Sequence, residues 1–107
     1  MAKFIQTISY TTSRIDEVLA LGEEFRAQRL AAIQGAKPIQ ISVCADRDVP
    51  NRYTTVVEFA SYEEAMENSN RPETAEFAQQ MMKICDGPPT FANLDVLKQM
   101  RPADETS

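Results

Sequence analysis

The stretch SNRPETAEFAQQMMKICDGPP at residues 69–89 decides the fold, because it predicts a helix that is broken near its start and stopped at its end. Pro72 lacks a backbone N–H and would clash with the carbonyl four residues earlier inside a continuous helix. We therefore expect a break at residues 68–71, with Pro72 in the first turn of a restarted helix. Gly87 is expected to supply a left-handed C-cap, and the two prolines after it prevent continuation.

Two further helical signals lie upstream of this break. Ser61 and Glu64 form a capping-box pattern, so a helix is expected to begin there. Nearer the N-terminus, Ser13 is the expected N-cap of a long helix and Gly35 its expected C-cap. The apolar residues of that long helix recur at three- and four-residue steps, at Ile15, Val18, Leu21 and Phe25.

Four runs of alternating apolar and polar residues predict half-buried strands. They are residues 3–10, 38–45, 53–60 and 90–97. The element order is therefore β-α-β-β-α-β, which is the ferredoxin-like α+β arrangement. Right-handed crossovers would place both helices on one face of a four-stranded antiparallel sheet.

The alternation also predicts which side chains face the helices. The helix side is expected to carry the more apolar set, namely Phe4, Ile8, Tyr10, Ile39, Ile41, Val43, Tyr53, Thr55, Val57, Phe59, Ala92, Leu94 and Val96. The reverse side is expected to carry Thr7, Ser9, Ser42, Cys44, Thr54, Val56, Glu58, Asn93 and Asp95.

Length, charge and hydropathy restrict the class of protein. A chain of 107 residues suits one domain, which we expect at residues 1–97, followed by a polar tail at residues 98–107. No apolar run approaches the roughly 20 residues of a membrane-spanning helix, and a cytoplasmic protein is expected. The net charge of −5 disfavours nucleic acid and an anionic membrane surface as partners, because both repel an acidic chain.

The residue types exclude several kinds of site. The chain has no histidine, which removes the usual general base and the usual metal ligand, so no metal site is predicted. Cys44 and Cys85 form no CxxC pair and are interpreted as reduced, buried thiols, which argues against a metallochaperone. The predicted reverse side of the sheet lacks the mid-sheet aromatic residues that an RNA-binding relative of this fold would use.

The segment YTTVVEFASYEEAMENSNRPETAEFAQQM at residues 53–81 resembles the dimeric α/β-barrel superfamily, and within it small single-domain proteins of the antibiotic biosynthesis monooxygenase type. The resemblance rests on a strand ending at Phe59, the helix opening from Ser61 to Ala65, the break before Pro72, and the aromatic Phe77. It implies a homodimer in which two sheets close a barrel, with a ligand cavity between each sheet and its own helices.

Some members of that family oxidise aromatic polyketides or quinols with dioxygen and without a cofactor, so the resemblance implies a small hydrophobic or aromatic ligand and no cofactor. Other members degrade haem with an Asn, Trp and His set, which this chain cannot supply because it has no Trp or His. No catalytic residue is identified. The candidate pocket residues are Tyr10, Tyr53, Tyr62, Asn68, Asn70, Arg71, Met66, Phe77 and Met81.

Two other functions stay open on the same scaffold. One is a non-catalytic ligand-binding or stress-associated barrel. The other is an isomerase, cyclase or decarboxylase, which would need a titrating group in the cavity, with Glu58, Asp95 or a tyrosine as candidates.

Overall fold

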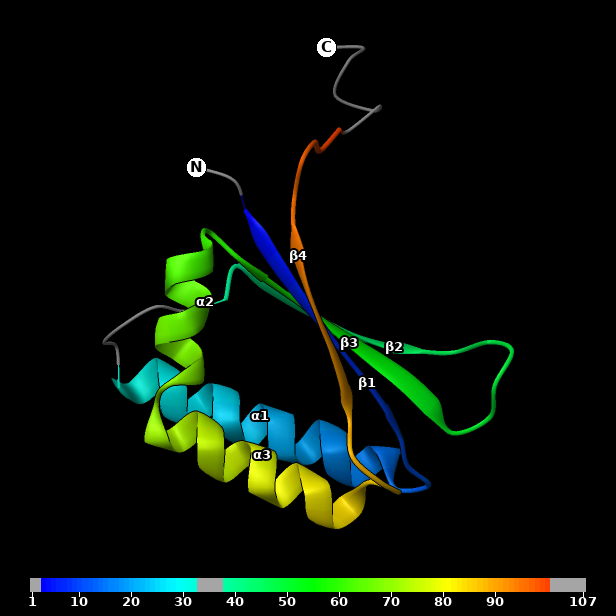
Figure 1. Cartoon of the computed structure of the whole chain (residues 1–107). Helices are drawn as coiled ribbons and strands as arrows, with labels where there is room; N and C mark the ends of the chain where they lie inside the picture. Colours follow the sequence, from blue (N-terminus) through cyan, green and yellow to red (C-terminus); the bar gives the residue numbers. More distant parts are fainter. Residues whose placement is uncertain (1–2, 33–37, 101–107) are drawn as a thin grey trace, which may run out of the picture.

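The computed structural model describes residues 3–32 and 38–100, with the backbone alone for residues 28–32. The expected C-cap at Gly35 lies outside the described residues. The elements within them are β1 (Phe4–Thr11), α1 (Ile15–Ala32), β2 (Gln40–Ala45), β3 (Arg52–Phe59), α2 (Tyr62–Ser69), α3 (Pro72–Ile84) and β4 (Thr90–Asp95). This order confirms the predicted β-α-β-β-α-β arrangement, with its second helix divided in two (Figure 1).

The four strands form one antiparallel sheet in the order β2-β3-β1-β4. β1 lies in the middle of the sheet, where Phe4 is the register partner of both Phe59 in β3 and Asp95 in β4. The described helices lie on one side of this sheet (Figure 1). The predicted ferredoxin-like α+β fold is confirmed.

The helix break occurs where the sequence predicts it. Pro72 is the first residue of α3, and Arg71 before it is extended, with φ −78° and ψ 142°. The freed backbone groups find new partners, because Asn70 N–H donates to Met66 O at 3.0 Å and Thr74 Oγ1 donates to Asn68 O at 2.7 Å. The proline therefore separates α2 from α3 without leaving these backbone groups unsatisfied.

The helix ends differ from expectation in two places. Gly87 has the predicted left-handed φ of +113°, but α3 already ends at Ile84, so this glycine shapes the turn into β4. α1 begins at Ile15, and the N-cap prediction for Ser13 is wrong. The side chain that bonds to the backbone at the start of α1 is that of Thr12, which is fully buried. Its hydroxyl accepts from Arg14 N–H at 2.9 Å and donates to Ile84 O at 2.5 Å. Thr12 thus ties the start of α1 to the end of α3.

The core lies between the middle strands and α2. Phe4, Val57 and Phe59 from β1 and β3 pack with Ala65 of α2, and all four are at most 9% exposed. Ser61 fixes the start of α2, because its Oγ accepts from Glu64 N–H at 3.2 Å. The helical cover is thereby centred on β1 and β3.

The predicted orientation of β4 is wrong. In antiparallel pairs, register partners share a face, and Phe91, Asn93 and Asp95 are the partners of Ile8, Gln6 and Phe4. These three β4 residues therefore face the helices, and Ala92 and Leu94 face the reverse side. The period-two pattern finds the strand, but either of its faces could be the inner one, and the register on β1 decides between them.

Candidate functional site

The helices cover only part of their side of the sheet. Side chains of the outer strands that point toward the helices stay exposed, and they form two separate surfaces. The β2 margin consists of Ile39 (52% exposed), Ile41 (51%) and Val43 (43%). The β4 margin consists of Phe91 (54% exposed), Asn93 and Asp95.

The β4 margin combines aromatic and amide groups. Gln6 of β1 donates from Nε2 to Asn93 Oδ1 at 3.1 Å. Phe4, two residues before Gln6 on the same face, meets the half-exposed ring of Tyr62 edge-on, with the centroids 5.3 Å apart. The amide pair uses one donor of Gln6 and one acceptor of Asn93, so each amide keeps polar atoms for a further partner. Such a surface can stack on a flat ring and hydrogen-bond its oxygen substituents.

Asn68 adds a polar group near the end of α2. It lies three residues after the buried Ala65, and this spacing places both on the sheet-facing side of the helix. Its Oδ1 is shielded from solvent and accepts no hydrogen bond from the described residues. A buried amide oxygen in this state is costly unless something else supplies the donor.

The other residues of the α2–α3 junction serve structural roles. Arg71 lies 3.5 Å from Glu67 and 3.9 Å from Glu73, and its side chain is only 20% exposed. Its charge is therefore already balanced by two carboxylates. Asn70 is exposed and is the C-cap residue of α2.

Tyr10 and Tyr53 form a second cluster near the other end of β1 and β3. Their rings stack with centroids 6.1 Å apart, and the buried Tyr10 hydroxyl lies 2.9 Å from Thr55 Oγ1. Burial raises the pKa of Tyr10, against the opposing effect of its hydrogen bond to Thr55. The phenol is therefore held neutral and is a poor base at neutral pH.

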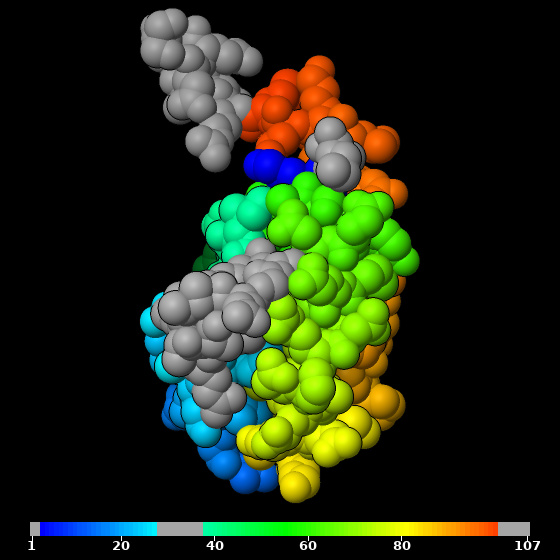
Figure 2. Space-filling view, turned by 90° about the vertical axis from the view of Figure 1, so that its left-hand side faces the viewer, coloured from blue at the N-terminus to red at the C-terminus, as the bar shows by residue number. Residues whose placement is uncertain are grey.

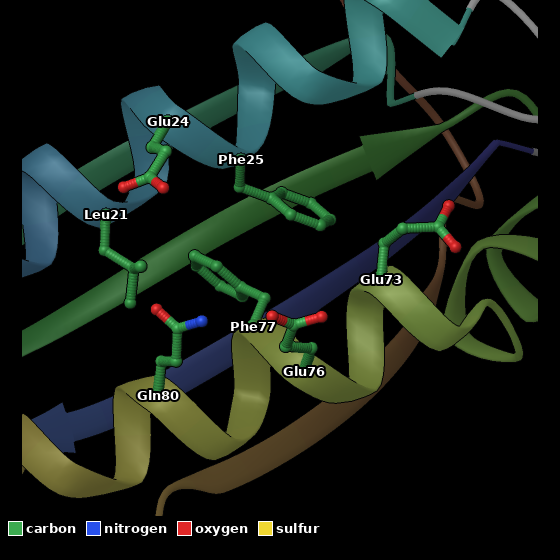
Figure 3. Close-up of a pocket in the computed structure, with 7 residues that line it drawn as sticks. All are labelled: Leu21, Glu24, Phe25, Glu73, Glu76, Phe77 and Gln80. Carbon is green, nitrogen blue, oxygen red and sulfur yellow. The ribbon is translucent and has the colours of Figure 1, made fainter.

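The apolar candidates are placed in the core and between helices. Met66 packs against the core, and Met81 is half-buried in α3. Phe77 packs against Phe25 of α1 with ring centroids 4.7 Å apart (Figure 3). These rings line a cavity of about 60 Å³ between α1 and α3, whose other lining residues are Leu21, Glu24, Glu73, Glu76 and Gln80. This volume is far below the several hundred Å³ of ordinary ligand pockets.

The structure thus separates the predicted residues. Tyr62 lies beside the β4 margin and Asn68 farther along the same helix, whereas Tyr10, Tyr53 and Phe77 belong to other clusters. Sequence reasoning missed Gln6, Phe91 and Asn93. Gln6 carried a signal, because it is the polar exception on the apolar side of the first strand.

The remaining titratable candidates give no support to acid–base catalysis. Glu58 is on the reverse side of the sheet, 3.5 Å from Lys3, and Asp95 is exposed on the helix side. Cys44 and Cys85 are free, and Cys44 is exposed, which corrects the expectation that both are buried. Burial raises the pKa of the Cys85 thiol and so disfavours the nucleophilic thiolate.

Two general findings concern the described parts of the chain. Among residues 3–32 and 38–100, no three acidic, cysteine or histidine side chains gather in a way that could hold a metal ion. None of the helices described there has the length and apolar character that crossing a bilayer requires.

Solved structures share this fold over nearly the whole chain. SnoaB, a cofactor-independent oxygenase from Streptomyces nogalater, has a TM-score of 0.73 and 13% identity, over 95% of this chain and 99% of its own. A candidate antibiotic biosynthesis monooxygenase from Caulobacter crescentus has a TM-score of 0.73 and 12% identity, over 91% and 92%. A conserved protein from Methanosarcina mazei has a TM-score of 0.72 and 11% identity, over 88% and 92%.

These likenesses confirm the fold that the resemblance in residues 53–81 implied. No protein-family model matches the sequence, and no curated protein matches it significantly.

Proposed function

We propose that the protein is a homodimeric, cofactor-independent oxygenase of the antibiotic biosynthesis monooxygenase type, acting on a small phenol, quinol or anthrone. The observation that carries the proposal is the open amide and aromatic surface of the β4 margin, on a fold shared with a cofactor-independent oxygenase. An aromatic substrate of this class presents a flat apolar ring with oxygen substituents, which matches both parts of that surface.

The substrate lies on the helix side of β1 and β4 in this proposal. Phe91 and Tyr62 offer ring faces and edges, both about half exposed. The Gln6–Asn93 pair meets one oxygen substituent, and Asn68 meets a second polar group with its buried amide. A rotation of 180° about the Cβ–Cγ bond exchanges the amide O and N positions of Asn68, so this side chain can present either an acceptor or a donor.

The chemistry needs little protein machinery. An anthrone methylene reacts with dioxygen to give a carbonyl and water, so one oxygen atom enters the product and the substrate supplies all the electrons. The first step is loss of a proton to the surrounding water, which gives an enolate or phenolate that then passes an electron to oxygen. An amide donor beside the developing oxyanion lowers the free energy of that step.

The dimer uses the reverse side of the sheet. This side carries small side chains, including Thr7, Ser9, Thr54 and Val56, and Ser9 Oγ lies 3.2 Å from Thr54 Oγ1. Small residues on a flat antiparallel surface allow a second sheet to approach closely. Two copies packed in this way would leave both β4 margins on the outside of the barrel, on the part of the helix side that the helices do not cover.

Incubation with a panel of anthrones and quinols under ¹⁸O₂ tests the proposal. We expect one ¹⁸O atom in the oxidised anthrone by mass spectrometry, at a rate above buffer. Asn93→Ala and Asn68→Ala should slow the reaction, and Gln79→Ala, an exposed amide on α3, should not. Absence of oxidation above buffer across the panel contradicts the oxygenase; if the same compounds still bind, the protein is a ligand-binding barrel.

A further inference from the structure

The helical layer carries a small hollow between α1 and α3. The two helices lie side by side on one face of the molecule, with α1 in blue to cyan and α3 in yellow-green to yellow (Figure 2). Phe25 and Phe77 point toward each other from the two helices and line the hollow (Figure 3). Its volume of about 60 Å³ is too small for a ring-sized substrate but suits the end of one side chain from a partner.

Carboxylates surround this pair of rings. Glu24 on α1 and Glu76 on α3 are exposed and flank the rings from opposite helices (Figure 3). No ion pair of Glu24 or Glu76 occurs in the part of the chain that the structure describes. Glu73 also lines the hollow, 3.9 Å from Arg71. Because the faces of aromatic rings are also negative, the hollow is suited to a positively charged group.

A wider groove of about 670 Å³ continues from the hollow along α1 and α3. Leu21 and Glu24 line both the hollow and the groove. Ala20 and Ile84 add apolar surface farther along, and the groove reaches Lys83. A partner segment that lies along the groove therefore meets apolar side chains over its length and concentrated negative charge only at the hollow.

An arginine side chain combines the properties that fit the hollow. Its planar guanidinium stacks on aromatic rings and donates to carboxylates, and its aliphatic stem packs against apolar surface. A small polyamine would meet the charges but would leave the apolar side chains of the groove uncovered. A protein segment meets both, and the net charge of −5 favours a basic one.

We propose that the groove between α1 and α3 docks a basic segment of a partner protein, which places one arginine side chain in the hollow. The guanidinium pairs with Glu24 and Glu76 and stacks on the rings of Phe25 and Phe77, and neighbouring apolar side chains of the segment cover Leu21. In the proposed dimer the reverse sides of the sheets pack together, so this face of the helices stays accessible. The contact goes beyond the oxygenase activity and does not depend on it, because the groove shares no residue with the β4 margin.

Two capped peptides of equal length test the contact. One alternates leucine with arginine, and the other replaces each arginine by citrulline, which is neutral and of the same shape. Titrated into ¹⁵N-labelled protein at low salt, the arginine peptide should shift the side-chain amide of Gln80 and the backbone of Phe25 and Phe77. The citrulline peptide should bind about tenfold more weakly or worse. Equal dissociation constants, shifts centred outside the groove, or no binding of the arginine peptide at millimolar concentration overturn the proposal.

A pair of double variants separates the groove from net charge. Glu24→Gln with Glu76→Gln removes the flanking charges at two exposed positions, and affinity for the arginine peptide should fall about five- to tenfold. Asp16→Asn with Glu63→Gln is the matched control, because it removes the same charge from exposed positions outside the groove. The control should change the affinity less than about twofold. Equal losses in the two double variants would mean attraction by net charge alone and overturn the proposal.

Spermidine distinguishes a protein segment from a small organic cation. It carries amines on a flexible chain and has no side chains to cover the apolar part of the groove. Spermidine should therefore shift the same signals only at higher concentrations than the arginine peptide does. Equal or tighter binding of spermidine, lost in Glu24→Gln with Glu76→Gln, would assign the hollow to a small cation and overturn the docking of a segment.

Discussion

The two margins of the helix side are equally open but chemically opposite. The β2 margin is wholly aliphatic, with Ile39, Ile41 and Val43 between 43% and 52% exposed. The β4 margin has Phe91 at 54% and adds the Gln6–Asn93 amide pair and Asp95. The exposed fraction of a margin therefore does not by itself indicate what kind of partner the margin binds. A row of aliphatic side chains suits an apolar contact with another protein surface, whereas ring faces with amides suit a small aromatic molecule.

Both margins depend on the core between them, so its loss should have the largest effect. Phe59 is 2% exposed and packs with Phe4, Val57 and Ala65. Phe59→Ala should lower the free energy of unfolding by about 3–5 kcal/mol. Phe91→Ala removes the same side chain from the half-exposed β4 margin and should cost about 1 kcal/mol or less. Urea denaturation followed by circular dichroism measures both; equal costs would mean that the β4 margin is not open.

Substitution within each margin should show which of the two binds substrate. Asn93→Ala should lower kcat/KM for an oxidised substrate about 10- to 100-fold through loss of a hydrogen bond. Ile41→Thr should leave kcat/KM nearly unchanged, because the substrate lies on the β4 margin and not on the β2 margin. Steady-state kinetics on both variants provide the comparison. Should Ile41→Thr lower kcat/KM as far as Asn93→Ala does, the division into two margins is wrong.

A smaller effect is expected where α2 is anchored beside the β4 margin. Ser61 Oγ accepts from Glu64 N–H at 3.2 Å, and Tyr62 follows it directly. Ser61→Ala should cost about 1 kcal/mol of unfolding free energy by loss of the cap. Ser69→Ala, at the exposed end of the same helix, should cost less than about 0.5 kcal/mol. Thermal and urea unfolding check both, and a neutral Ser61→Ala would show that the cap does not hold this helix.

An effect of similar size is expected at Tyr10, away from both margins. Loss of its hydrogen bond to Thr55 in Tyr10→Phe should cost about 0.5–1.5 kcal/mol at neutral pH. Burial raises the folded-state pKa of Tyr10 above its ordinary value of 10.0. The wild type should therefore lose stability as the pH rises from about 10 through that folded pKa, and the variant should lack this loss. The gap between the two should shrink above pH 10, and a gap that widens there contradicts the burial of this phenol.

Most of the fold was predictable because its signals are local. Pro72 places the helix break, Ser61 places the start of α2, and period-two alternation places the four strands. Each signal depends on residues within one turn or one strand, where backbone sterics and hydrogen bonding act directly. The element order then leaves few topologies.

The candidate site was less predictable because it depends on distant pairings. Gln6 and Asn93 are 87 residues apart, and no local pattern joins them. The orientation of β4 rests on its register with β1, because Phe91 on one face and Leu94 on the other are both apolar. Periodicity also cannot show how far a helix covers a sheet, so the two margins are visible only once α2 is placed over β1 and β3.

Chemical-shift mapping with anthraquinone, a stable aromatic that resembles an oxidised anthrone, tests the division of the helix side most directly. Titration into ¹⁵N-labelled protein should shift the side-chain amides of Gln6 and Asn93 and the backbone of Thr90–Asp95, and leave Ile41 and Val43 unchanged. Shifts centred on residues 39–43, or none at saturating ligand, would contradict the assignment of ligand binding to the β4 margin.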